Sequence, residues 1–159
     1  MGGAASSNDV ESVERVIPAS AERIFAILAD PARHSEIDGS GTVKGVKTPA
    51  QPLALGSKFG MSMKLGVPYS MESTVIEFEP NRRIAWQTRP PGRIPGKLAG
   101  GRIWRYELEP AGEGTLVRES WDISQEVLKV LVKPARGKTI KAMADTLQRI
   151  EDLLAAEQS

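Results

Sequence analysis

The chain has 159 residues and a formal net charge of +1, with 40% hydrophobic and 26% charged residues. These values are ordinary for a globular protein and predict one domain, large enough to bury a sizeable core or to enclose a pocket. The absence of cysteine excludes disulfides, thiol catalysis and thiolate zinc sites. Because the sequence has no secretory signal and no apolar run of about 18 residues, we expect a cytoplasmic protein without stable membrane insertion.

The first nine residues, MGGAASSND, are small and polar. Such residues bury too little apolar surface to fold, so they predict a disordered segment or a remnant of cloning. A single domain is expected over residues 10–156. It begins with a strand candidate at residues 10–17, which Pro18 ends.

Two short helices are predicted after this strand. Ser20 has the placement of an N-cap for a helix that ends near Ala29. Asp30 and Pro31 form the N-cap and N1 pair that starts many helices, and they predict a second helix to about Ile37.

After a glycine-rich turn at residues 38–41, the hydrophobic period changes from that of a helix to two. Alternating apolar and polar residues are typical of strands with one buried face. The strand candidates are residues 58–65, 69–79, 82–88, 102–109 and 115–121. Short turns link them, which predicts an antiparallel meander of about six strands.

The last third of the chain is predicted to be helical. Apolar residues from Ile140 to Leu154 recur at steps of three and four, which indicates a helix from about residue 134 or 138 to 156. Pro134 either kinks one continuous helix from about Gln125 or occupies N1 of a second helix. An antiparallel sheet with one apolar face needs a cover, and this helix is large enough to supply it. The fold class is therefore α+β, with a sheet curved around the helix.

Three stretches carry a family resemblance: VERVIPASAERIFAILADPARHSEIDGS, ESTVIEFEPNRRIAWQT and RIWRYELEPAGEGTLVRESWD. With the final amphipathic helix, they resemble the polyketide cyclase/dehydrase branch of the START-like (SRPBCC, helix-grip) superfamily, from Val10 to Ala155. The resemblance implies a curved antiparallel sheet of six to seven strands around a long C-terminal helix, with two short helices after the first strand. It also implies a deep apolar cavity between sheet and helix. Ile37 departs from the family, which often has tryptophan in the second short helix.

Residues expected to face such a cavity lie on the apolar phase of the strands and of the last helix. They are Phe59, Met61, Met63, Met71, Ser73, Trp86, Trp104, Tyr106, Glu119, Trp121, Met143 and Leu147. Side chains of this kind are more often plain core, but here the inner sheet face serves as both core and pocket wall. An inward Glu119 must be neutral or paired with an arginine, whereas Arg105 and Arg118 lie on the opposite phase and are expected to face solvent.

His34 is the single histidine, four residues from both Asp30 and Asp38. This spacing would place three metal ligands on one helix face, but Asp30 is needed as a cap and Asp38 opens a turn. We therefore expect no metal. A role as general base or ligand donor near the cavity mouth is retained, because histidine transfers protons near pH 7. No Gly-x-Ser-x-Gly motif supports a catalytic triad.

The stretch RPPGRIPGKLAGG at residues 89–101 is similar to a phosphate-binding loop. The glycine spacing is one residue short, Leu98 follows Lys97, and strands flank the stretch, so it is not a P-loop. Thirteen residues are long for a hairpin connection. The sequence predicts either a mobile loop at the cavity mouth, where Arg93 and Lys97 contact a ligand carboxylate, or a variable surface loop.

Basic residues gather in residues 80–106 and 127–144, neither of which contains an acidic residue. Such segments can steer an acidic ligand or bind nucleic acid, but a solvated surface is the more common explanation. Because the aromatic residues lie on the apolar phase, no nucleic-acid partner is expected.

Two functions are consistent with these features. The first is binding of a small hydrophobic ligand, such as a lipid, polyketide, isoprenoid or quinone, in the cavity. The second is polyketide aromatase/cyclase or dehydratase activity in the same cavity, with His34, Glu119 and Tyr106 as candidate catalytic residues. The scarcity of inward polar residues favours binding. No cofactor is expected, and the protein is expected to be a monomer or weak homodimer.

Overall fold

A computed structural model describes residues 9–39, 43–46, 52–65, 67–91 and 100–157. Its seven-stranded antiparallel sheet has the order β1-β7-β6-β5-β4-β3-β2. The strands are β1 (Val10–Ile17), β2 (Val43–Val46), β3 (Lys58–Leu65), β4 (Val67–Glu79), β5 (Arg83–Arg89), β6 (Arg102–Ala111) and β7 (Gly114–Asp122). Strands β2 to β7 form the predicted meander, and β1 pairs with β7. The short β2 was not among the strand candidates.

Two short helical segments follow β1 as predicted. Helix α1 (Ala21–Leu28) is capped by Ser20, whose hydroxyl accepts a hydrogen bond from Arg23 N at 3.2 Å. The second segment begins as the 3-10 turn η1 (Pro31–Arg33) and continues as α2 (His34–Ile37). Asp30 Oδ1 accepts from Ala32 N at 3.1 Å, so the predicted cap is present.

The C-terminal helical region contains α4 (Lys129–Val132), the 3-10 turn η2 (Lys133–Ala135) and α5 (Arg136–Glu157). Pro134 lies in the first turn of η2, where its missing N–H leaves no helical hydrogen bond unmade. Neither alternative for Pro134 is therefore exact: a 3-10 turn separates the two helices, and the long helix starts two residues after the proline.

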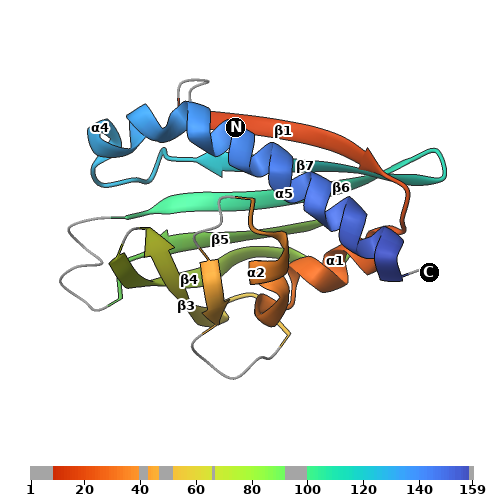
Figure 1. Cartoon of the computed structure of the whole chain (residues 1–159), viewed down its shortest axis with the longest axis horizontal. Coiled ribbons are helices and arrows are strands. Elements are labelled where there is room, and N and C mark those ends of the chain that lie inside the picture. The colour runs from red at the N-terminus through yellow and green to blue at the C-terminus, as the bar shows by residue number, and fades with distance from the viewer. Residues whose placement is uncertain (1–8, 40–42, 47–51, 66, 92–99, 158–159) are drawn as a thin grey trace.

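Helices α5, α1 and α2 lie on one side of the strands, here called the inner face (Figure 1). The core fills the space between this face and α5. From the helix it receives Met143, Leu147, Ile150 and Leu154, and from the strands it includes Ile17, Val75, Ile84, Tyr106 and Val117. This arrangement confirms the predicted helix-grip fold, a curved antiparallel sheet around a long C-terminal helix.

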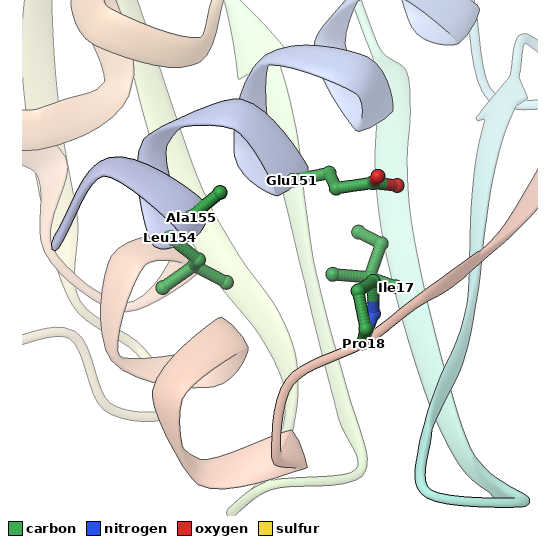
Figure 2. A pocket seen from close by; sticks show the side chains of 5 residues that line it. All are labelled: Ile17, Pro18, Glu151, Leu154 and Ala155. Carbon is green, nitrogen blue, oxygen red and sulfur yellow. The ribbon is translucent and has the colours of Figure 1, made fainter. Parts of the chain in front are cut away.

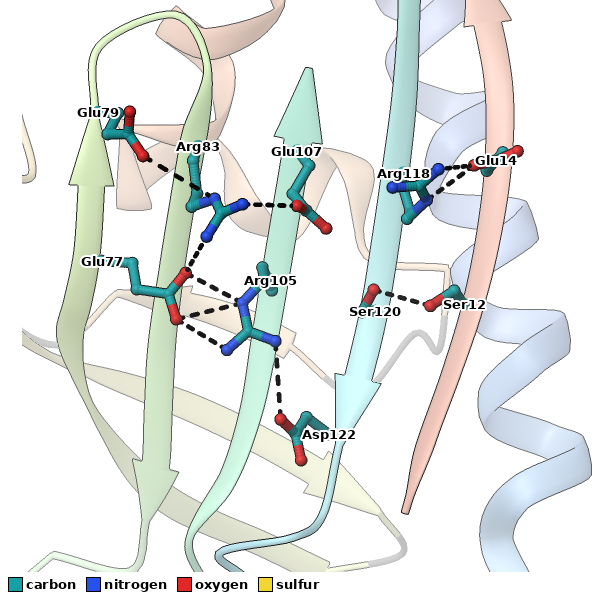
Figure 3. A network of polar contacts seen from close by, with 10 residues as sticks. All are labelled: Ser12, Glu14, Glu77, Glu79, Arg83, Arg105, Glu107, Arg118, Ser120 and Asp122. Carbon is teal, nitrogen blue, oxygen red and sulfur yellow. Dashed lines mark hydrogen bonds and ion pairs between the residues drawn. The ribbon is translucent and has the colours of Figure 1, made fainter. Parts of the chain in front are cut away.

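The opposite, outer face of the sheet carries a network of ion pairs (Figure 3). Arg105 contacts the carboxylate of Glu77 at 2.7 Å and that of Asp122 at 3.6 Å, and it links three strands. Arg83 contacts Glu77 and Glu107, and Arg118 pairs with Glu14 of β1. Arg105 and Arg118 thus lie on the outer face, as their phase predicted. Because neighbouring acids neutralise them, these three arginines do not form a basic patch.

Helix α2 is held against α5 by a close backbone approach. Gly39 N donates to the hydroxyl of Thr146 in α5 at 2.9 Å. A Cβ atom at Gly39 would lie 2.2 Å from Ala142 O, so any larger residue would push the two elements apart. Glycine at this position therefore fixes α2, and with it His34 and Asp38, over the inner face of the sheet.

We expect Leu147→Ala to lower the free energy of unfolding by about 2–5 kcal/mol, because it truncates a side chain buried between α5 and the sheet. Urea denaturation measures the loss. The control is Leu55→Ala, which changes an exposed leucine and should alter stability by less than about 0.5 kcal/mol. A similarly small loss for Leu147→Ala would contradict the packing of α5.

Candidate functional site

Most of the predicted cavity residues lie on the inner face. Phe59, Met61, Ser73, Trp86, Tyr106, Glu119 and Trp121 are buried there. Met63, Met71 and Trp104 share this face but are only half-buried. The inner face therefore has a closed region and, towards β3 and the start of β6, an apolar region that water still reaches.

Glu119 is the most unusual of these residues. It is 3% exposed, and its neighbour across the β6–β7 ladder is Tyr106. The other neighbour, across β1, is Val13, so the sheet supplies no cation beside it. Among the described residues, Oε1 of Glu119 is buried without a hydrogen-bond partner. A buried polar atom without a partner costs about 1–3 kcal/mol, and a group that hydrogen-bonds to this oxygen would remove that cost.

Burial raises the pKa of Glu119 to about 8, because a charged carboxylate loses its hydration inside the protein. A hydrogen bond with the Tyr106 hydroxyl opposes the rise, and the nearby carboxylate of Asp38 adds to it. The pKa of Tyr106 is also raised well above its ordinary value, first by burial and then by Glu119. Near neutral pH, Glu119 is therefore mainly a neutral acid that can both donate and accept a hydrogen bond. Of the two predicted states, neutral or paired with arginine, the raised pKa and the absence of an arginine directly opposite on β1 and β6 favour the first.

The His34 side chain is buried, with 5% of its surface exposed, and its predicted role near a cavity mouth stays a prediction. Its ring stacks on Trp86 with 4.9 Å between centroids and meets Phe59 edge-on at 5.5 Å. His34 Nε2 is 2.9 Å from the carbonyl oxygen of Leu28, which can only accept, so Nε2 carries the proton. Burial lowers the pKa of His34, and the imidazole is neutral. These contacts give His34 a packing role and show no base directed at solvent.

The aromatic contacts continue from His34 along the inner face. Trp86 lies 5.7 Å from Phe59 in an edge-on arrangement and 5.7 Å from Tyr106 in a tilted one. Tyr106 is in turn the cross-strand neighbour of Glu119. The structure thus brings together residues that the sequence could only place on separate elements: helix α2 and strands β3, β5, β6 and β7 of the meander.

The sequence analysis did not identify two polar residues of this region, Thr88 and Asp38, as site residues. The Thr88 hydroxyl lies 2.8 Å from that of Ser73, and both side chains are buried on the inner face. Thr88 has the same phase as Ile84 and Trp86, and this alternation could have identified it. Asp38 was interpreted as a turn residue, and its electrostatic effect on Glu119 depends on the packing of α2, which no local pattern reveals.

The other predicted ligand-binding residues do not contribute to the contacts around Glu119. Trp121 and Met143 form a second, small core cluster with Ile123, and Leu147 packs in the main core. Arg93 and Lys97 lie outside the described residues, as does the loop at residues 92–99, so their roles stay predictions.

The described residues do not outline the expected deep cavity, which stays a prediction. A small pocket of ≈ 40 Å³ opens elsewhere, between the end of β1 and the last turns of α5 (Figure 2). Its walls are Ile17, Pro18, Glu151, Leu154 and Ala155. Pockets for drug-sized ligands usually measure about 300–1,000 Å³, so this pocket has room for little more than water.

The described part of the chain shows neither a metal-binding cluster nor a membrane-spanning helix. No group of three or more histidine, aspartate and glutamate side chains there is arranged to hold a metal ion. None of its helices is both long enough and apolar enough to span a bilayer.

The amino-acid sequence is similar to that of a mycobacterial protein. The chain is 44% identical over 114 residues to the uncharacterized protein Rv0088 of Mycobacterium tuberculosis. That match covers 70% of the chain but 45% of Rv0088, so the chain spans about half the length of this relative.

Solved structures share the fold at low identity. A protein from Arthrobacter aurescens superposes with a TM-score of 0.74 at 17% identity, covering 94% of this chain and 87% of that one. DynU16, a protein in the dynemicin biosynthetic locus, superposes with a TM-score of 0.62 at 15% identity, covering 92% of this chain and 47% of DynU16. The family model described as polyketide cyclase / dehydrase and lipid transport matches residues 11–156. The chain therefore belongs to the polyketide cyclase/dehydrase and lipid transport family.

Proposed function

We propose that the protein binds a small hydrophobic ligand between the inner face of the sheet and α5, and that Glu119 and Tyr106 hold one polar oxygen of that ligand. The observation that carries the proposal is the buried Glu119 carboxyl, whose Oε1 has no hydrogen-bond partner in the described part of the chain. A ligand hydroxyl or carbonyl at this atom would remove the cost of the unmade hydrogen bond.

The apolar part of the ligand has a suitable surface nearby. Met63, Met71 and Trp104 are half-buried on the inner face, and methionine adapts its shape to different apolar partners. The ligand class is therefore a lipid, polyketide, isoprenoid or quinone with a hydroxyl or carbonyl group. Membership of a family that includes lipid transport agrees with this class.

The same carboxyl favours a second candidate function, polyketide cyclisation or dehydration. With a pKa of about 8, Glu119 can donate a proton near neutral pH, and the Tyr106 hydroxyl beside it can orient a substrate carbonyl. Binding remains the preferred function, because the neutral His34 donates to Leu28, and the Tyr106 hydroxyl, whose pKa burial raises well above its ordinary value, stays protonated and supplies no base near neutral pH. Consumption of a β-hydroxy thioester by the wild type, but not by Glu119→Gln, would establish the enzyme instead.

Equilibrium dialysis with two matched probes tests the binding proposal. We expect saturable binding of 2-naphthol, and weaker binding of naphthalene by about tenfold, because the hydroxyl adds a buried hydrogen bond worth about 1–1.5 kcal/mol. Glu119→Leu should bind both probes with similar affinity, since it replaces the carboxyl by an apolar side chain of comparable size.

The control variant is Glu109→Leu, which makes the same change at an exposed position of β6. It should keep the wild-type preference for 2-naphthol. If neither probe binds saturably, the proposed binding function is wrong. Equal preference in Glu119→Leu and the wild type would remove Glu119 from the binding site.

The raised pKa of Glu119 also predicts a pH dependence of stability. Between the unfolded value near 4.5 and the folded value of about 8, the folded protein binds more protons than the unfolded chain. The free energy of unfolding of the wild type, relative to Glu119→Gln, should therefore fall as pH rises from 5 towards 8, by at most ~1.4 kcal/mol per pH unit. Urea denaturation of both proteins across this range measures the difference. A constant difference would mean that Glu119 titrates as an ordinary surface acid.

A further inference from the structure

A cluster of exposed apolar side chains lies just before α5, outside the inner-face site. Eight large hydrophobic residues are exposed in the described part of the chain, and half of them lie within residues 127–131. They are Val127, Leu128, Val130 and Leu131, called here the apolar tip. Val130 is 75% exposed and Leu131 69%. Apolar residues concentrated in this way often mark an interaction site, whereas isolated ones are ordinary.

The apolar tip is held in place by its surroundings. Val127 N donates to Gly100 O at 2.9 Å, and Leu131 N donates to Leu128 O at 3.0 Å. Just before the tip, Arg102 contacts the buried carboxylate of Glu126 at 3.2 Å. Just after it, Val132 packs against the small core cluster of Trp121, Ile123 and Met143. The backbone is anchored on both sides, while the four apolar side chains remain exposed.

The chain segment that contains the tip is basic. Residues 127–144 contain five lysines and arginines and no acidic residue. Lys129 and Arg136 pair with Asp9 and Glu11, but Lys133 and Lys138 are exposed and make no ion pair with any described residue. Apolar side chains at a tip with cations around them match the boundary of an anionic membrane, where acyl chains lie beneath negative headgroups.

We propose that the apolar tip and the adjoining Lys133 and Lys138 dock the protein reversibly on membranes that contain anionic phospholipids. A protein partner fits less well, because a stable protein interface buries roughly 800 Å² on each side, more than these six residues can supply. A membrane requires insertion of a few side chains and attraction of a few charges. This proposal does not depend on the ligand-binding function, since none of these residues belongs to the Glu119 site.

Docking would place a particular end of the molecule on the membrane. The tip contacts Gly100, two residues before β6, and the half-buried Trp104 lies four residues further along the chain. In Figure 1, α4 lies at the end of the sheet where β5 ends and β6 begins. A membrane-bound molecule would thus present this end of its sheet to the lipid.

Vesicle sedimentation of the full chain tests the proposal. We expect binding to vesicles of phosphatidylcholine mixed with phosphatidylglycerol, and at least about tenfold weaker binding to phosphatidylcholine alone. Raising the salt to about 1 M should weaken binding to the mixed vesicles, because the Debye length falls to about 3 Å.

Two double variants separate the apolar and charged contributions. Val130→Ser with Leu131→Ser, and Lys133→Glu with Lys138→Glu, should each weaken binding to the mixed vesicles by about tenfold or more. The matched controls are Leu55→Ser, at another exposed leucine, and Lys58→Glu with Lys64→Glu, at two exposed lysines of β3. Both controls should bind like the wild type.

Several results would overturn the proposal. These are equal binding of the wild type to both kinds of vesicle, or equal losses in the tip variants and their controls. Light scattering provides a third: a lower solution mass of Val130→Ser with Leu131→Ser than of the wild type would show that the tip joins two copies of the chain. Circular dichroism of each variant identifies any that are unfolded, and Val130→Asp alone then replaces the double change.

Discussion

The packing of α5 against the inner face of the sheet is the contact on which the other features depend. A sheet with one apolar face cannot leave that face in water, and α5 is the longest element available to cover it. Leu147 and Ile150 fill the centre of this contact. Gly39 then attaches α2 to the same helix through Thr146, and this attachment holds Asp38 and His34 above the strands. The geometry around Glu119 is therefore a consequence of how α5 lies.

Carboxyl groups on the two faces of the sheet differ in their protonation state. On the outer face, Arg105 and Arg83 lie among carboxylates from neighbouring strands, and partial exposure lets water reduce the cost of bringing charges together. The guanidinium of Arg105 accordingly lowers the pKa of Glu77. On the inner face, Glu119 has no such partner in the described part of the chain, so burial instead favours its protonated form. One sheet thus contains both a charged and a neutral glutamate, and the surroundings of each decide which.

The strands and capped helices could be predicted because their signals are local. Period-two alternation identified β3 to β7, and Ser20 and Asp30 marked the helix starts. The short β2 gave no such signal. The burial of His34 also depended on contacts distant in sequence: its partners Trp86 and Phe59 come from other elements, and α2 reaches them because α5 holds it there. Local patterns therefore predicted elements well and the surroundings of individual polar groups poorly.

The identity of residue 119 is difficult to explain by stability alone. Its neighbours on the inner phase of β7, Val117 and Trp121, are buried apolar residues, so this face readily accepts an apolar side chain. A leucine at position 119 would avoid both the desolvation of a carboxyl and the unmade hydrogen bond at Oε1. A residue that costs stability at a site where a cheaper one would fit is better explained by function, because functional sites are where such costs are tolerated. The cost of burying Glu119 therefore supports the proposed ligand-binding role over a purely structural one.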